Sequence, residues 1–547
     1  MIIKSDGVYE NDTPLTNFAL REINPLFAPS SPDSLVAISM LVTAPGFVDQ
    51  VVVTVERSML SQILEKIPTA RVTGSINPGI FDNTVLVTAL KSPKKGLYFD
   101  KNGFVKVNDN WVFLAGSDLL GDCGGYTATV SPNLSKVHLA CNQDSDEKAA
   151  IENIVGEMKA NKATVWPTYC FTLAGALRSH IMNLGISTFP ALYVYGPQNY
   201  GKTTLVSRCC LLYESELTSS KEGLFSANST AKGLFHELSE MNDQVVLVDD
   251  LAKASCSAIE KKRMELVADV LRYAANDSTR YTASNRDSPQ ICRVSVAFTG
   301  EFPLKAPSDL TRILEIHLQK PIIGNLKMSR SDAATAFRAW IRWLLPRFDN
   351  ELASLAEKIL QNKGDENARI NTTKIILNFV NELFFRFALE MDIVDRDYYE
   401  SMLEIGERRF SNILDIQSQK VIRSQQERPE GNLSWYIQKG YRNGAFHVVE
   451  RRKQLINSDD CIIEKDCLCI RSETLLAYLV KQPNMHLLTD KQMIRQLKEE
   501  GVFGDLSNAE GPRAVVKEKR TAKKKIKGHR YLELNFEALR KAAKRYL

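Results

Sequence analysis

The stretch that decides the fold is Ala191–Cys210, ALYVYGPQNYGKTTLVSRCC. Its apolar first part ends at Tyr195, and residues 196–203 then fit the pattern G-x-x-x-x-G-K-[ST]. That pattern belongs to a loop that leaves a buried strand, wraps a phosphate and opens a helix. The context of strand, loop and helix is present here, which favours a phosphate-binding loop over a glycine-rich turn with an exposed lysine.

The residue types in this loop suit a nucleoside triphosphate with Mg²⁺. Gly196 and Gly201 allow tight turns that aim backbone N–H groups at phosphate. Lys202 supplies charge for the β- and γ-phosphates, and the hydroxyl of Thr203 can hold Mg²⁺. We therefore predict that ATP contacts Gly196, Pro197, Gln198, Asn199, Tyr200, Gly201, Lys202, Thr203 and Thr204.

A second run, QVVLVDD at residues 244–250, predicts the other half of the site. A continuous apolar run of this length is typical of a buried parallel strand. Acids at its carboxyl end would lie at the ligand-binding edge of an open α/β sheet. We expect Asp249 to reach Mg²⁺ through water and Asp250 to orient the attacking water, although Glu is the usual residue at the second position.

Bulk composition indicates a soluble protein of several domains. The 547 residues are 44% hydrophobic and 25% charged, as in ordinary globular proteins. No apolar run is long enough to cross a membrane, and the first residues have no signal-peptide pattern. The scattered cysteines then predict reduced thiols in a cytoplasmic protein.

The net charge of +5 is unevenly distributed. Residues 513–547 hold 13 Lys/Arg against 3 Glu, a balance of +10, so the other residues sum to −5. Positive charge gathered at one end of a chain is a common footprint of nucleic-acid binding.

The pattern of the chain predicts five regions. Residues 1–147 carry short β-type runs, including VAISMLVT, QVVVTVE, NTVLVTAL, GLYFD, GFVKV and NWVFLAG, and predict a mainly β accessory domain. Residues 148–327 predict the ATPase core, residues 328–430 a helical lid or bundle, and residues 431–459 a linker. In residues 460–547, two helices followed by a basic hairpin predict a winged helix.

Several polar residues outside the loop are candidate functional groups. A predicted hairpin over residues 278–302 carries Arg280 and Arg286, which either reach a nucleic acid or are ordinary surface arginines. Thr299 ends the next strand, where many P-loop ATPases sense the γ-phosphate. Arg312 is either an arginine finger for a neighbouring subunit or part of a surface ion pair.

The basic hairpin near the carboxyl end is either a wing that contacts DNA phosphates or a solvated loop. Its candidate contacts are Lys519, Arg520, Lys523, Lys524, Lys525 and Lys527.

With these motifs, the chain resembles the helicases of phages, chromosomal islands and cassette elements that are similar to the minichromosome maintenance ATPases. The resemblance covers about residues 165–320, through YGPQNYGKTT, VVLVDD, the hairpin before AFTGE, and DLTRILEI. It implies an AAA+ ATPase that forms a homohexameric ring, shares ATP between neighbours and moves single-stranded DNA through a central channel. It further implies that Lys202, Thr203, Asp249 and Asp250 hold nucleotide and Mg²⁺, Thr299 is the sensor, Arg312 the finger in trans, and the Arg286 hairpin lines the channel.

Three functions fit these residues. The first is an ATP-dependent DNA helicase that helps to replicate a mobile element, with single-stranded DNA in the channel and duplex on the winged helix. The second is an ATP-gated initiator or regulator that binds DNA without unwinding it. The third is a defence or signalling ATPase with a DNA-sensing end.

Overall fold

The structure is a computed structural model of the whole chain. It describes residues 1–141, 146–186, 188–251, 257–275, 291–304, 306–361, 368–426, 432–449, 460–464, 466–482, 485, 488–503 and 531–544. The chain divides into two compact units. The first consists of residues 1–253, 266–302 and 312–414, and the second consists of residues 254–265, 303–311 and 415–547.

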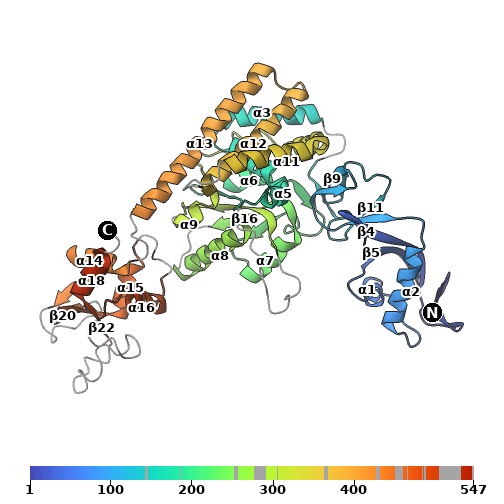
Figure 1. Ribbon diagram of the computed structural model, residues 1–547, viewed down its shortest axis with the longest axis horizontal. Coiled ribbons are helices and arrows are strands. Elements are labelled where there is room, and N and C mark those ends of the chain that lie inside the picture. Colours follow the sequence, from blue (N-terminus) through green and yellow to red (C-terminus); the bar gives the residue numbers. More distant parts are fainter. Residues whose placement is uncertain are drawn as a thin grey trace. The chain divides into compact units, whose positions relative to one another are not determined.

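A parallel sheet forms the centre of the first unit (Figure 1). Its strands in spatial order are β15 (Leu224–Ser226), β16 (Asn242–Leu251), β17 (Arg293–Gly300), β13 (Ala191–Tyr195) and β18 (Ile313–His317). All neighbouring strands pair in parallel. Every residue of β13 is buried, as expected for a strand covered on both faces. The predicted mixed α/β fold with a parallel sheet is confirmed.

Helices and one short strand connect and cover this sheet. They are α3 (Glu147–Ala160), α4 (Val165–Ala176), α5 (Arg178–Asn183), α6 (Lys202–Cys210), β14 (Tyr213–Ser215), α7 (Ala231–Glu240) and α8 (Ser257–Ala275), of which residues 266–275 belong to this unit. Helix α4 is buried at every position, which fits its apolar character all round.

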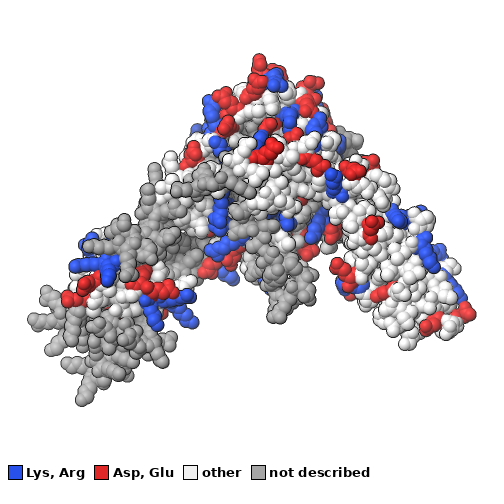
Figure 2. All heavy atoms as spheres, viewed as in Figure 1, with Lys and Arg blue, Asp and Glu red and all other residues white. Residues whose placement is uncertain are grey.

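A helical layer follows the sheet in the chain. It contains α10 (Arg330–Leu344), the 3-10 turn Leu345–Arg347, α11 (Phe348–Gln361), α12 (Ala368–Glu390) and α13 (Arg396–Gln426), the last of which belongs to this unit up to Leu414. Trp166 Nε1 of α4 donates to Asn381 Oδ1 of α12 at 2.7 Å, so the layer is tied to the helices on the sheet. Acidic and basic side chains are interspersed over its surface in Figure 2. The role of this layer as a lid stays a prediction.

The first 140 residues are mainly strands. They are β1 (Ile2–Lys4), β2 (Gly7–Glu10), β3 (Thr13–Pro14), β4 (Ala19–Ala28), β5 (Ser31–Ala44), β6 (Phe47–Thr54), β7 (Gly96–Phe99), β8 (Gly103–Val107), β9 (Asn110–Ala115), β10 (Asp118–Leu120), β11 (Thr127–Val130) and β12 (Val137–Leu139). The largest sheet has the order β11-β7-β4-β5-β6, and β10-β9-β8 form a second. Two helices, α1 (Met59–Lys66) and α2 (Pro78–Leu90), pack with the first sheet around a shared apolar core.

The predicted strand NTVLVTAL is wrong, because residues 83–90 are the last part of α2. The Asn77 side chain accepts hydrogen bonds from the N–H groups of Gly79 and Ile80, and Pro78 occupies the first turn. Both features start a helix. The helix start signal therefore outweighs the β-branched composition that favours a strand.

The second unit contains the carboxyl end of the chain. Its elements are α9 (Pro307–Leu310), α14 (Leu433–Arg442), β19 (His447–Val449), β20 (Asp460–Glu464), β21 (Cys467–Arg471), α15 (Ser472–Leu479), α16 (Asp490–Glu499), β22 (Tyr531–Asn535) and α18 (Phe536–Lys544). The strands form one sheet in the order β19-β20-β21-β22, and α14, α15, α16 and α18 share its apolar core. Phe503 bridges Leu534 in antiparallel fashion, so the chain on both sides of residues 504–530 is paired. The winged helix stays a prediction.

Two further predictions from the sequence concern membrane-spanning segments and the state of the cysteines. Within the described residues, no helix combines the length and the apolar character needed to cross a membrane. The described cysteines are all free thiols.

A buried polar junction joins the amino-terminal strands of the first unit to the start of β16. Asn102 Nδ2 donates to Gln244 Oε1 at 2.6 Å, and Asn242 Nδ2 donates to the Asn102 carbonyl at 2.9 Å. Gly103, at φ +114°, lies so close that an added Cβ would be 2.9 Å from Asp243 Cβ. Residues 102–103 and 242–244 therefore fit each other closely although some 140 positions separate them.

Asp243 is the fully buried acid of this junction. Its carboxylate accepts from the Ser179 N–H at 2.7 Å and from Asn242 Nδ2 at 2.9 Å. Burial raises the pKa of Asp243 to about 7, although the hydrogen bonds from Ser179 and the charges of Arg178 and Arg293 act in the opposite direction. The carboxyl therefore titrates near neutral pH in the folded chain.

We predict that Asp243→Asn changes how stability depends on pH. The folded chain keeps the Asp243 proton up to a pKa of about 7, whereas an aspartate in the unfolded chain ionises at its ordinary pKa of 3.8. Ionisation therefore favours the unfolded chain, and stability falls as the pH rises between these values. The free energy of unfolding of the variant, relative to wild type, should increase by up to about 1.4 kcal/mol per pH unit in that window.

Urea unfolding at a series of pH values measures this difference. Asp109→Asn, at an exposed carboxylate in the same unit, serves as the control and should follow wild type. Parallel curves for wild type and Asp243→Asn would contradict a raised Asp243 pKa.

Candidate functional site: a phosphate loop at the edge of the parallel sheet

The loop Gly196–Gly201 joins the end of β13 to the first residue of α6. Gly201 lies at φ +88°, and an added Cβ would be 2.7 Å from Ile323 Cγ1 and 2.8 Å from Ile322 Cγ2. A Cβ on Gly196 would be 2.7 Å from the Leu318 carbonyl oxygen. Both positions therefore require glycine, for backbone conformation at Gly201 and for close approach at both.

The backbone of this loop presents unpaired donors. The Gly196 N–H donates to the Gly300 carbonyl at 3.1 Å, and the Leu205 N–H donates to the Gly201 carbonyl at 2.8 Å. Among the described residues, no protein acceptor pairs with the N–H groups of residues 198–204. Successive free N–H groups at a helix N-terminus form an anion-binding concavity. The predicted nucleotide contacts of residues 196–204 thus lie on one continuous turn that fits phosphate.

Lys202 lies over the same turn. Its Nζ donates to the carbonyls of Gly196 at 3.0 Å and Pro197 at 2.9 Å. An ammonium held there by two neutral acceptors can exchange them for the stronger charge-assisted bond to a phosphate oxygen.

Asp249 gathers the remaining polar groups of the site. Its Oδ1 accepts from Thr203 Oγ1 at 2.9 Å and also from the Thr299 hydroxyl. The structure thus brings together three predicted residues: Asp249, Thr203 46 positions before it and Thr299 50 positions after it. Strand β17, which carries Thr299, lies between the loop strand β13 and the acidic strand β16.

Thr203 and Asp249 are suitable oxygen ligands for Mg²⁺. No group of three or more His, Cys, Asp or Glu that could hold a metal occurs in the described part of the chain. Mg²⁺ is commonly bound by few protein oxygens plus phosphates and water. These two residues therefore fit a metal that arrives with a triphosphate.

Asp250 has an unusual backbone at φ +71°. Asp and Asn populate this left-handed region more readily than residues with longer side chains. The conformation gives a physical reason for Asp where Glu is the commoner residue. Asp250 is exposed, as a group that contacts a water nucleophile would be.

Arg312 lies at the amino ends of β13 and β18, whereas the loop of residues 196–201 follows the carboxyl end of β13. Its carbonyl accepts from the Ala191 N–H at 2.8 Å, which places it level with the first residue of β13. The five residues of β13 span roughly 16 Å. Arg312 is thus far from the loop of its own chain, and a role for it in this chemistry requires the loop of another chain.

The predicted DNA contacts all lie outside the described residues. They are Arg280, Arg286, Lys519, Arg520, Lys523, Lys524, Lys525 and Lys527.

Sequence reasoning missed the residues that support the loop from behind. Leu318, Ile322 and Ile323 follow β18, and the Ile322 N–H donates to the Tyr200 carbonyl at 3.0 Å. No motif marks them. The available signal is that a glycine loop needs a close neighbour, and an apolar pair shortly after the last core strand is a suitable one.

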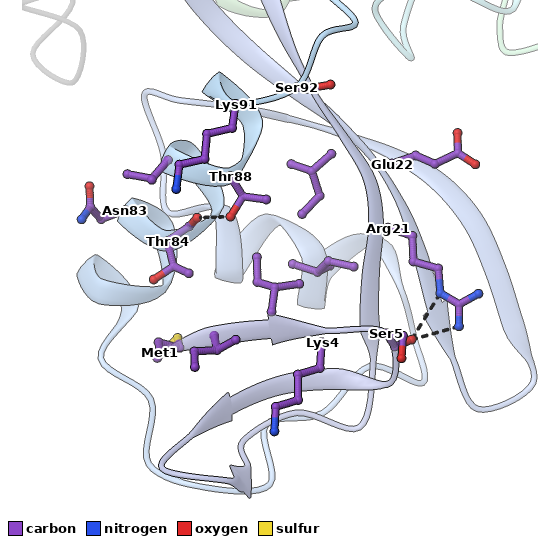
Figure 3. Close-up of a pocket in the computed structure, with 15 residues that line it drawn as sticks. Met1, Lys4, Ser5, Arg21, Glu22, Asn83, Thr84, Thr88, Lys91 and Ser92 are labelled. Carbon is purple, nitrogen blue, oxygen red and sulfur yellow. Dashed lines mark hydrogen bonds between the residues drawn. The ribbon is translucent and has the colours of Figure 1, made fainter.

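A second hollow, of about 790 Å³, lies among β1, β4 and α2 in the amino-terminal part (Figure 3). Several of its polar groups are already engaged with protein partners. Lys4 pairs with Asp12 at 2.8 Å, Arg21 donates to the Ser5 carbonyl, and the Thr88 hydroxyl donates to the Thr84 carbonyl. Because these groups do not converge on a common point, the hollow does not have the character of a catalytic site.

Comparisons with known proteins support the fold. The sequence matches no protein-family profile, and no curated protein matches it significantly. Among solved structures, the chain is similar to Cch of SCCmec type IV, described as an active helicase, with 13% identity over 98% of each chain and a TM-score of 0.51. At this identity the likeness shows a shared fold. An inhibitor-bound JCV helicase also matches, with 13% identity over 49% of this chain and 74% of its own, but its TM-score of 0.20 supports no argument.

We predict that Gly201→Ala weakens nucleotide binding. The new Cβ meets Ile322 and Ile323 and is strained at positive φ, so the loop must move its N–H groups. Titration with a fluorescent ATP analogue should show affinity lower by about tenfold or more.

Gly324→Ala is the matched control, because an added Cβ there has no neighbour within 4 Å. It should bind as wild type, and circular dichroism should show both variants folded. Wild-type affinity in Gly201→Ala would remove the loop from the binding site.

Proposed function

We propose that this protein is an ATP-dependent DNA helicase or translocase that acts as a homohexamer in the replication of a mobile genetic element. The observation that carries the proposal is the convergence of free loop N–H groups, Lys202 and the Thr203–Asp249 pair at one edge of a parallel sheet. Such a set binds a triphosphate with Mg²⁺ and stabilises the charge of the transferred phosphoryl group.

Each residue has a defined part in this chemistry. The N–H groups of residues 198–204 hold the phosphates, and Lys202 neutralises charge on the β/γ oxygens. Thr203 and Asp249 would hold Mg²⁺, which supplies electrostatic stabilisation when bound. Asp250 orients the attacking water and accepts its proton.

Three arguments support DNA as the second ligand. Residues 513–547 carry a charge balance of +10, which favours phosphate contacts that depend on salt. The motifs resemble those of mobile-element helicases. The fold is similar to that of an active cassette helicase along nearly the whole length of both chains.

The position of Arg312 supports a multimer. Since it lies at the edge of the sheet remote from its own loop, it can complete a nucleotide site only by reaching into a neighbour. An arginine supplied in trans stabilises transition-state charge and explains why a ring would be needed for turnover.

Lys202→Ala tests the nucleotide half of the proposal. Loss of the ammonium should abolish ATP hydrolysis and strand displacement on a forked duplex while DNA binding persists. Lys232→Ala, an exposed lysine on α7, is the control and should behave as wild type.

Normal unwinding by Lys202→Ala would refute the helicase proposal. Wild-type protein that hydrolyses ATP and protects a specific duplex, yet displaces no strand, would instead identify an ATP-gated initiator.

Mixing two inactive variants tests the role of Arg312. Arg312→Ala and Lys202→Ala should each hydrolyse little ATP alone. In a mixed ring, an Arg312→Ala subunit supplies an intact loop and its Lys202→Ala neighbour supplies the arginine, so some sites become complete. Recovery of DNA-stimulated ATP hydrolysis on mixing is expected, and no recovery at any ratio would contradict action in trans.

A further inference from the structure

Thr299 is almost fully buried, and the one proton of its hydroxyl is already donated. It donates its proton to Asp249 Oδ1 and accepts from the Asp250 N–H at 3.3 Å. A hydroxyl has only one proton to donate. Thr299 therefore cannot donate to a phosphate oxygen without releasing Asp249.

The two acids lie in a β-bulge opposite this one residue. Along β16 and β17, Val248 pairs with Phe298 and Leu251 pairs with Gly300, so Asp249 and Asp250 together oppose Thr299. Two residues against one is the definition of a bulge, and a bulge re-aims side chains that would otherwise alternate between the faces. The φ of +71° at Asp250 belongs to the same irregularity.

We propose that Thr299 is a positioning residue that holds this bulge, and that it acts on hydrolysis through Asp249 and Asp250 and not by contacting the γ-phosphate. This inference rests on the proposed ATPase function. It assigns the Thr299 hydroxyl the task of fixing the side chain of one acid and the backbone of the next. It also explains why position 250 is Asp, since the held backbone conformation disfavours Glu.

Two substitutions of Thr299 test the proposal. Thr299→Val keeps the shape and removes the hydroxyl, whereas Thr299→Ser keeps the hydroxyl. For Thr299→Val we expect a kcat for ATP hydrolysis lower by about 100-fold, because a displaced catalytic group loses alignment. The affinities for ATPγS and ADP should keep their wild-type ratio, and Thr299→Ser should restore most of kcat.

A γ-phosphate contact would give a different result. Thr299→Val would then bind ATPγS more weakly while ADP binding stayed the same, and this outcome would overturn the proposal. An unchanged kcat in Thr299→Val would overturn it as well.

A double-mutant comparison shows whether Thr299 acts through Asp250. Asn tolerates the left-handed backbone, so Asp250→Asn should remove the carboxylate and keep the fold. In that background, adding Thr299→Val should lower kcat little further, because the group that Thr299 positions is already absent. A full additional loss would mean that Thr299 acts independently of Asp250.

Hydrogen exchange separates this inference from the proposed function, since it needs no activity. Thr299→Val leaves the Asp250 N–H without its acceptor, so a peptide covering residues 249–251 should exchange faster, while residues 191–195 keep wild-type exchange. Thr299→Ser should match wild type. Unchanged exchange in Thr299→Val overturns the bulge clamp even in an active enzyme, whereas an inactive wild type with faster exchange in the variant refutes only the ATPase.

Discussion

The carboxylate of Asp249 is the point at which the site is assembled. It belongs to β16, yet it accepts hydrogen bonds from Thr203 at the start of α6 and from Thr299 at the end of β17. Strand β16 is two strands away from β13, or about 10 Å. The first turn of α6 bridges this gap, so one carboxylate fixes the loop, its helix and the sheet in mutual register.

The strand order makes this arrangement possible. Because β17 is inserted between β13 and β16, a polar residue at its end can contact an acid on one side while the neighbouring Gly300 carbonyl receives the Gly196 N–H on the other. The loop is thereby supported on the β17 side by Gly300 and on the β18 side by the segment 318–323. Within the described part of the chain its remaining N–H groups have no protein acceptor, which suits an anionic ligand.

The loop and the acidic strand are predictable from the sequence because both are local patterns with a physical cause. Glycine spacing and a buried apolar run need no knowledge of distant residues. The bulge at Asp249–Asp250 was not predictable, because an irregularity inside a strand depends on the partner strand and leaves no mark in composition. The apolar support of Gly201 was missed for the same reason.

The fold shows a similar division between local and distant information. Strands such as β5 and β9 follow from β-branched and aromatic runs, whereas α2 forms from a similar run because Asn77 and Pro78 start a helix. A boundary at residue 147 follows from a change of periodicity alone. This predicted boundary falls between Asn102 and Gln244 in the sequence, yet their side chains are hydrogen-bonded to each other in the interior of one unit.

Strand β16 has the junction residues Asn242–Gln244 at its beginning and the two acids at its end. A β-strand held by ladders on both sides resists stretching and sliding. A displacement of residues 102–103 at the start of β8 is therefore transmitted to β16, the strand that carries Asp249. The amino-terminal strands and the phosphate loop thus share a mechanical linkage, and neither can shift along the strand direction without straining the other.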